Sequence, residues 1–269
     1  KADRFDRVRY TNMCLAAGKY LRKHAVREAH VCLAELPVED LDADWRLRQS
    51  VLAIDHGNYR YVTTKPLRSD EPHPLDAASF HGGADRQAAL DQAIALSAGI
   101  RRARELGNLP PNICTPAYLA QECTSIAEGN DRCSIEVLKP DDMAELGMDA
   151  LLAVGQGSDN PPRLIVLQYQ GAGKDERPYV LVGKGVTFDS GGISIKPSSG
   201  MGWMKFDMSG AATVMGVMRA VAEMELPIRS TYRSPSKSAA GCQVSNRRHA
   251  SGGNPSIAMH RRFLPVFRV

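Results

Sequence analysis

The chain has 269 residues, of which 43% are hydrophobic and 24% charged, a composition typical of a soluble globular protein with one or two domains. No apolar run reaches the roughly 18 residues that a membrane-spanning helix needs, and the charged opening KADRFDRVRY lacks the apolar segment of a secretory signal, so we expect a cytoplasmic protein that does not enter a membrane. The net formal charge of +4 arises in segment 229–269, which holds eight of the 34 basic residues and no acidic ones, and residues 1–228 carry −4.

The first third of the chain predicts two helices and a short strand. Apolar residues recur at helical spacing over RVRYTNMCLAAGKYLRKH, and the short apolar run HVCLAEL follows as a strand. A second helix is expected within residues 39–64. Residues 65–85 are rich in Pro, Gly and Asp, and we interpret them as a loop or domain edge.

The strongest helical pattern of the chain lies in residues 85–109. Asp85 suits the N-cap position, the arginines of the last turns suit the helix dipole, and Gly107 suits the position just after the helix. Pro110 and Pro111 then end the pattern. A long helix between a loop and a Pro-Pro pair is expected to connect two domains.

From about residue 110 onward, helical and strand patterns alternate, which predicts an α/β fold. Thr115 as N-cap and Pro116 at the first helical position begin a helix over TPAYLAQECTSIAEG. SIEVL is strand-like and DDMAELG is helical. The runs RLIVLQYQ and YVLVG are rich in Val, Ile and Leu, and such runs suit central strands buried on both faces of a sheet.

Cysteine and histidine usage indicates neither a disulfide framework nor a zinc finger. The six cysteines form no CxxC pair, so we expect reduced, buried thiols. The seven histidines are scattered along the chain, and the sequence predicts no histidine-based zinc site.

Residues that can carry chemistry concentrate in one stretch, YVLVGKGVTFDSGGISIKPSSGMGWMKFDM, at residues 179–208. Lys184 and Asp189 follow the expected strand YVLVG, at the carboxyl end where open α/β sheets place their sites. Asp207 precedes the helix expected from Ser209 and could cap it. Carboxylates are hard oxygen ligands for divalent ions, and a lysine near such an ion can serve as a ligand or a base. Taken singly, each residue fits a solvated loop position better than a site.

The combination is more specific than its parts. VGKGVTFDSGGISIKP followed by MKFDMSGAA resembles the leucyl aminopeptidase, or cytosol aminopeptidase, family. Lys184, Asp189, Lys196 and Asp207 match that family's Lys with an Asp, a Lys and an Asp at offsets of 5, 12 and 23. RELGNLPPNICTPAYLA and MRAVAEMELPI are also similar to the family, so the resemblance covers most of residues 1–228.

The resemblance implies a cytoplasmic, usually hexameric aminopeptidase that uses two divalent metal ions, Mn²⁺ or Zn²⁺, and removes leucine-like residues from the N-termini of peptides. By the family pattern, Lys184 ligates one metal, Asp189 contacts both, and Asp207 ligates the first. Lys196 is the implied catalytic lysine, which polarises the scissile carbonyl or steadies the oxyanion.

Two departures from the family pattern bear on activity. The family continues past Ile228 with a strand and an Asn-Thr-Asp-Ala-Glu-Gly-Arg-Leu motif, which supplies two further metal ligands and a catalytic Arg. We find no such motif after Ile228, so three of the five expected metal ligands are present and full metal occupancy is not expected. The family's N-terminal domain also begins before the residue matching Lys1. We therefore expect a chain truncated at both ends, with a non-matching tail that a frameshift near codon 229 would explain.

The sequence thus predicts an α/β protein in four segments. These are a partial N-terminal α/β domain (1–84), a connecting helix (85–109), an incomplete α/β catalytic domain (110–228) and a disordered basic tail (229–269). Two alternatives to an active aminopeptidase stay open. The first is a catalytically inactive fragment, for which a hexamer is not expected. The second, less favoured, is a protein that binds DNA through the basic tail.

Overall fold

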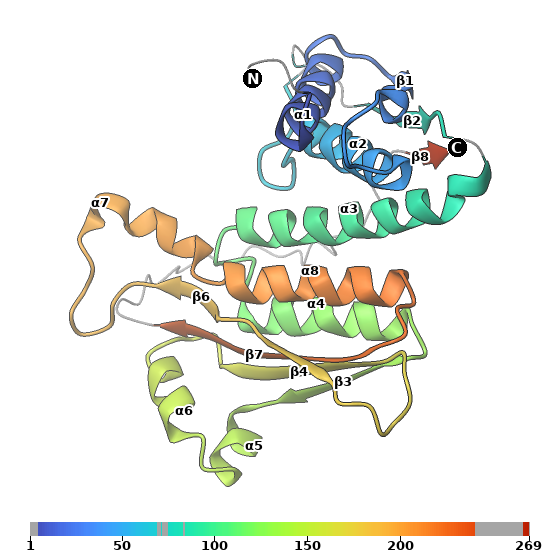
Figure 1. Ribbon diagram of the computed structural model, residues 1–269. Coiled ribbons are helices and arrows are strands. Elements are labelled where there is room, and N and C mark those ends of the chain that lie inside the picture. Colours follow the sequence, from blue (N-terminus) through green and yellow to red (C-terminus); the bar gives the residue numbers. More distant parts are fainter. Residues whose placement is uncertain (1–4, 69–70, 72–74, 83, 240–265, 269) are drawn as a thin grey trace.

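The computed structural model describes residues 5–68, 71, 75–82, 84–239 and 266–268. Its helices are α1 (Arg7–Lys23), α2 (Ala43–Asn58), α3 (Gln87–Asn108), α4 (Pro116–Glu128), α5 (Pro140–Glu145), α6 (Asp149–Gly155), α7 (Ser198–Met201) and α8 (Ser209–Glu223), with 3-10 turns η1 (Leu33–Glu35), η2 (Ala84–Arg86) and η3 (Gly202–Phe206). Its strands are β1 (Glu28–Val31), β2 (Ala77–Phe80), β3 (Cys133–Leu138), β4 (Arg163–Gln170), β5 (Tyr179–Val182), β6 (Gly185–Asp189), β7 (Arg229–Ala239) and β8 (Val266–Arg268). Figure 1 shows the mixed α/β arrangement that the sequence predicts.

The N-terminal layer packs α1 and α2 against a small parallel sheet of order β1-β2-β8. Because β8 comes from the far end of the chain, both ends of the described chain meet in this layer (Figure 1). Leu47, Ile54, Phe80 and Leu90 are buried together between the helices and the sheet. Removing such apolar side chains from water is the main favourable term that holds a layer of this kind together.

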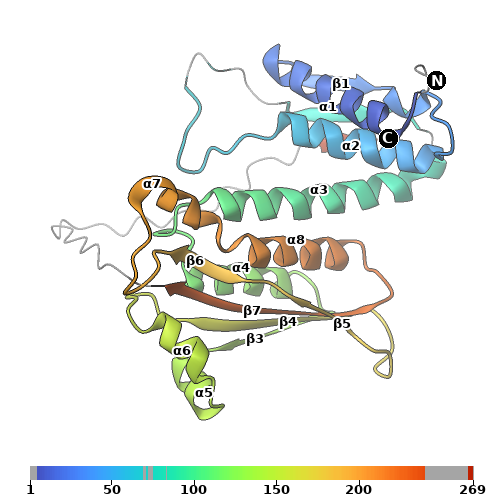
Figure 2. The ribbon, with the colours of Figure 1, turned by 60° about the vertical axis from the view of Figure 1, so that its left-hand side comes forward.

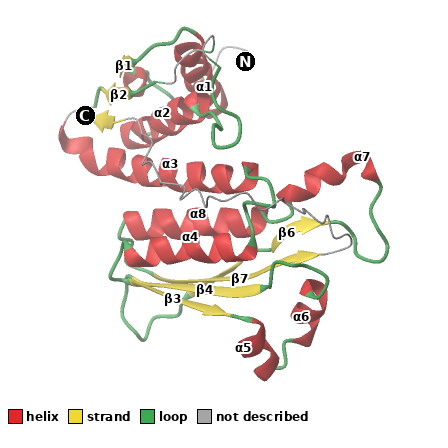
Figure 3. Ribbon diagram, turned by 180° about the vertical axis from the view of Figure 1, so that it is seen from behind, coloured by secondary structure: helices red, strands yellow, loops and turns green. Residues whose placement is uncertain are grey.

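The larger layer is a five-stranded mixed sheet. Its order is β3-β4-β7-β5, and β6 pairs with the same edge of β7 beyond β5. α4 and α8 cover one face, and α5 and α6 lie on the other side, as Figures 1 and 3 show. Ile165 and Leu167 of β4, Met215 of α8 and Tyr232 of β7 are fully buried between the sheet and the two helices.

α3 joins the two layers, lying between α2 and α8 (Figure 2). Two glycines allow its close approach to α8. A Cβ atom at Gly99 would lie 2.3 Å from the carbonyl oxygen of Gly216, and one at Gly216 would lie 2.4 Å from that of Gly99. Real Cβ atoms do not come this close, so the two helices meet backbone to backbone only because neither residue has a side chain.

Two arginines of α3 also bind it to both layers. Arg101 forms an ion pair with Asp55 of α2, and Arg102 forms one with Glu122 of α4. The Glu122 side chain is 1% exposed, so its charge depends on Arg102 for compensation. The sequence assigned these arginines to the helix dipole, whereas the structure uses them as links between helices.

The two predicted ends of α3 differ from the structure. Asp85 lies in η2 instead of capping the helix, and Arg86 occupies the N-cap position without a side-chain hydrogen bond. Gly107 lies inside the helix, which continues through Asn108. Helical hydrogen bonding stops only where Pro110 follows, because proline offers no N–H.

The predicted start of α4 is confirmed, and two strand predictions are corrected. The Thr115 hydroxyl accepts a hydrogen bond from the Tyr118 N–H at 3.2 Å, with Pro116 at the first helical position. β2 lies inside the segment 65–85 that was predicted as a loop. β5 was predicted to be a buried central strand, but it is an edge strand whose Val180 side chain is 55% exposed.

The predicted disordered tail is wrong for its first eleven residues, which form β7 between β4 and β5. Its inward face is lined by Ser230, Tyr232, Ser234 and Ser236, all buried. This alternation has the period of a strand, but serines on the buried face gave no hydrophobic signal. Residues 240–265 and 269 lie outside the described residues, so the prediction is not tested there.

Arg229, the first basic residue of the predicted DNA-binding tail, is part of this sheet. Its Nε donates to the Gln170 side-chain oxygen at 2.8 Å, and its Nη1 donates to the Glu176 carbonyl at 2.8 Å. The guanidinium is therefore engaged within the fold. Most of the other basic residues of the tail lie outside the described residues, and DNA binding stays an untested alternative.

The cysteines of the described chain are all unpaired, and three of the five are buried as expected. Burial raises the pKa of the Cys14 thiol to about 11 and that of the Cys114 thiol to about 12. Cys32 differs from the prediction because it is exposed. Within the described residues, no helix combines the length and the apolar character that crossing a membrane requires.

Candidate active site

The four predicted site residues lie around β6, at the end of the sheet next to the N-terminus of α8. Lys184 occupies the link between β5 and β6, and Asp189 is the last residue of β6. Lys196 lies in the loop that connects β6 to α7. Figure 1 shows this loop extending away from the sheet before it reaches α7. Asp207 lies between η3 and α8.

The structure brings these residues together as two pairs. The Lys184 Nζ donates to Asp207 Oδ1 at 2.7 Å, and the Lys196 Nζ lies 3.3 Å from Asp189 Oδ2. Lys184 precedes β6 and Asp189 ends it, and the pairing of β6 with β7 shifts register between Val186 and Asp189. Ion pairs this accessible to water contribute only about 0–1 kcal/mol to folding stability. Stabilisation of the fold therefore does not explain why these residues are paired.

The β5–β6 link is held by hydrogen bonds on two sides. The Gly183 N–H donates to the Arg233 carbonyl at 3.0 Å, and the Ser234 hydroxyl donates to the Gly183 carbonyl at 2.9 Å. The Ala211 N–H, in the first turn of α8, donates to the Lys184 carbonyl at 2.8 Å. Lys184 is therefore fixed between β7 and the start of α8.

The loop after β6 is a tight turn in the segment DSGG. Asp189 Oδ1 accepts the Gly191 N–H at 2.9 Å, and the Lys196 N–H donates to the Ser190 carbonyl at 2.9 Å. Gly191 has a φ of +95°, and a Cβ there would lie 2.4 Å from the Ser194 carbonyl oxygen. Only glycine fits this position, and the turn it permits places Lys196 beside Asp189.

The Asp207 carboxylate indicates that a cation fits here. Its Oδ1 accepts from Lys184, but its Oδ2 is buried and has no hydrogen-bond partner among the described residues. A buried carboxylate oxygen without a partner is costly, and a divalent ion would compensate it. Asp207 was also predicted as a possible cap of α8, which is wrong: Met208 occupies the N-cap position and no side-chain cap forms.

Sequence reasoning missed one residue that positions the site. Ser234, which holds the Gly183 carbonyl, lies in the stretch predicted as tail, so its strand context was not visible. Trp203, just before the family-like segment MKFDM, is 68% exposed and stacks on Phe206 at a centroid distance of 5.8 Å.

Comparisons with a family model and with curated proteins both find similarity to cytosol aminopeptidases. The model of the cytosol aminopeptidase family, catalytic domain, matches residues 101–237, just over half of the chain and nine residues beyond the predicted end of the resemblance. The chain is 45% identical over 230 residues to a probable cytosol aminopeptidase of Xylella fastidiosa, covering 85% of this chain and 46% of that protein. It is also 45% identical over 208 residues to one of Legionella pneumophila, covering 77% and 42%.

Three solved structures have a similar fold. The bottromycin maturation enzyme BotP in complex with Mn superposes with a TM-score of 0.75 and 29% identity, over 86% of this chain and 48% of that one. The cytosol aminopeptidase from Coxiella burnetii gives a TM-score of 0.64 and 30% identity, over 76% and 41%. A mutant of tomato leucine aminopeptidase gives 0.73 and 25%, over 89% and 46%. The chain spans about half the length of the curated relatives it matches.

Proposed function

Because the chain belongs to the cytosol aminopeptidase family, we propose that it carries the two Lys–Asp pairs of a two-metal aminopeptidase centre. The reaction is hydrolysis of the peptide bond after a leucine-like N-terminal residue. The observation that carries the proposal is the buried, unpartnered Oδ2 of Asp207 beside Lys184. This donor set of carboxylates and an amine suits Mn²⁺ or Zn²⁺.

Three residues hold the metals in this proposal. Lys184, in the β5–β6 link, and Asp207, between η3 and α8, would hold one ion, and Asp189 at the end of β6 would contact both. Bound divalent ions supply a nucleophile at neutral pH and polarise the scissile carbonyl. For Lys184 to act as a ligand, its amine would release to water the proton that it donates to Asp207 in the structure.

Lys196 acts on the substrate. Its Nζ carries three donors and is 3.3 Å from Asp189, close to the proposed metal ligands, on a loop whose turn is closed by the Ser190–Lys196 backbone hydrogen bond. An ammonium placed there donates to the carbonyl oxygen of the scissile bond and stabilises the negative charge that develops on it. Its side chain is 37% exposed, so a peptide can reach it.

The location and the substrate in this proposal are inferred from the names of the relatives. They are named cytosol aminopeptidases, which supports a cytoplasmic location and a peptide substrate. A homohexamer is the assembly that the family resemblance implies. The family motif Asn-Thr-Asp-Ala-Glu-Gly-Arg, with its two further metal ligands and its Arg, does not occur in this sequence. The experiment therefore has to distinguish an active chain from an inactive one.

The test is hydrolysis of leucine p-nitroanilide by the full chain with added Mn²⁺. We expect turnover that Asp189→Ala abolishes and that Asp159→Ala, at an exposed loop position in the same layer, leaves unchanged. A chain that binds Mn²⁺ but shows no turnover supports the inactive alternative. Turnover that persists in Asp189→Ala contradicts the proposed site.

A further inference from the structure

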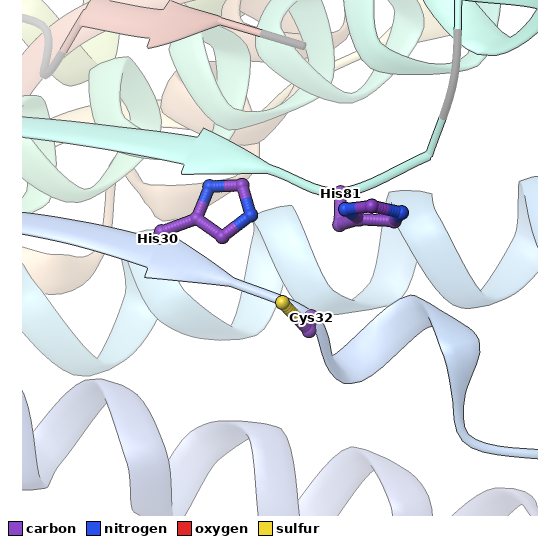
Figure 4. Close-up of side chains that lie close together, drawn as sticks. All are labelled: His30, Cys32 and His81. Atoms are coloured by element: carbon purple, nitrogen blue, oxygen red, sulfur yellow. The ribbon is translucent and has the colours of Figure 1, made fainter.

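A second group of metal-ligating side chains lies in the N-terminal layer, away from the proposed active site. Figure 4 shows His30, Cys32 and His81 gathered at the ends of β1 and β2. Their potential ligand atoms all lie within 4.8 Å of one another, and all three residues are exposed. None of them takes part in the proposed aminopeptidase centre.

The pairing of β1 with β2 explains how residues about 50 positions apart meet. The strands are parallel, with His30 opposite Ser79 and Val31 opposite Phe80. Side chains alternate between the faces of a strand, and Val31 and Phe80 are buried. His30 and Cys32 are two residues apart and therefore lie together on the outer face. His81 lies there too, and its backbone N–H donates to the Val31 carbonyl at 2.9 Å.

Each imidazole is already oriented by a neighbour. The His30 Nδ1 lies 2.8 Å from the Ser79 hydroxyl oxygen, and the His81 Nε2 lies 3.0 Å from Glu35 Oε1. A hydrogen bond or ion pair at one ring nitrogen leaves the other to face a metal, which is how proteins fix ligating histidines. The rings stand edge to face with centroids 5.9 Å apart.

We propose that His30, Cys32 and His81 bind a divalent transition-metal ion of the zinc class, with the second nitrogen of each imidazole and the Cys32 thiolate as ligands. Thiolate and imidazole are the donors that zinc prefers. Ideal tetrahedral coordination at zinc bond lengths needs ligand atoms about 3.4–3.6 Å apart, so these exposed side chains must close by about 1 Å. The thiolate and the Glu35 carboxylate together balance the charge of the ion.

The donor types separate this site from the proposed aminopeptidase centre. Mn²⁺ favours the oxygen ligands of Asp189 and Asp207, whereas a thiolate selects zinc-class ions. Cobalt(II) is a suitable probe, since a thiolate bound to it gives an intense charge-transfer absorption that oxygen and amine ligands do not give. This signal depends on Cys32 and is independent of any peptidase activity.

The experiment titrates the full, reduced chain with Co²⁺ in excess Mn²⁺ and then displaces the cobalt with Zn²⁺. We expect one thiolate-ligated Co²⁺ per chain, and complete loss of the charge-transfer band in Cys32→Ser. His81→Ala should weaken binding at least tenfold, and Glu35→Gln, which removes the orienting carboxylate, should weaken it 10- to 100-fold. Circular dichroism checks that each surface variant is folded.

Cys133→Ser provides the matched control, because Cys133 is another unpaired, partly accessible thiol of the described chain. It should leave the band unchanged. Absence of the band in the wild-type chain, its persistence in Cys32→Ser, or its loss in Cys133→Ser each overturns the proposal. None of these results bears on the aminopeptidase centre, whose own test is peptide hydrolysis.

Discussion

The contact between α3 and α8 gives a testable prediction, because the same substitution at two sites of α3 should change stability by different amounts. Gly99→Ala introduces a Cβ atom 2.3 Å from the Gly216 carbonyl oxygen, and relieving this clash requires the helices to move apart by almost 1 Å. Gly107→Ala in the same helix meets only Phe206, at 3.8 Å, which is an ordinary van der Waals contact.

The magnitude follows from two terms. Both substitutions gain up to about 1 kcal/mol of helix propensity. Gly99→Ala alone pays for overpacking, at about 1–3 kcal/mol. The difference between the two variants therefore isolates the steric term. We expect Gly107→Ala to be neutral or slightly stabilising, and Gly99→Ala to be less stable than Gly107→Ala by about 1–3 kcal/mol.

The assay is urea unfolding of the two variants and the wild type, monitored by circular dichroism. The midpoints are compared where the dependence of the unfolding free energy on urea concentration is the same for all three. A shift of the midpoint to lower urea in Gly99→Ala alone supports the backbone-to-backbone contact. Equal midpoints for the two variants would refute it, since the propensity gain is shared and only the clash distinguishes them.

Three further predictions concern buried ionisable groups. Glu122→Gln leaves the Arg102 guanidinium without its counter-ion and should destabilise the chain by about 3–5 kcal/mol in urea unfolding, whereas Glu128→Gln, exposed on the same helix, should change stability little. Burial raises the pKa of the Cys114 thiol from 9.0 to about 12, so stability should be unaffected below pH 9 and should fall as pH rises from 9 toward 12, because the unfolded chain loses the proton first. At pH 8, iodoacetamide should label Cys32 rapidly and Cys114 only after unfolding, and equal labelling rates would contradict the burial.

Local signals account for the parts of the fold that the sequence predicted well. Thr115 and Pro116 form a self-contained helix start, and the structure places α4 there. The Gly-rich turn after Asp189 is local in the same way, since its geometry is set by neighbouring residues. The candidate site residues were found from a spacing pattern, and the structure adds their pairing and the buried oxygen of Asp207.

The features that the sequence missed depend on contacts between distant segments. β7 has a buried face of serines and one tyrosine, which lacks the apolar alternation that marks a strand. The approach of His81 to His30 and Cys32 follows from the parallel pairing of β1 and β2, which no local pattern encodes. Asp85 failed as a cap because the chain forms a 3-10 turn before α3 begins.

The central claim, that Asp207 and Lys184 help to form a metal centre, is tested most directly by Mn²⁺ binding to the full chain, measured by calorimetry or electron paramagnetic resonance. Loss of a charged ligand interaction worth about 1.5–3 kcal/mol predicts that Asp207→Asn weakens Mn²⁺ binding about 10- to 100-fold. Asp159→Asn, at an exposed loop position, should leave the affinity unchanged. Equal Mn²⁺ affinities for these two variants would contradict the account.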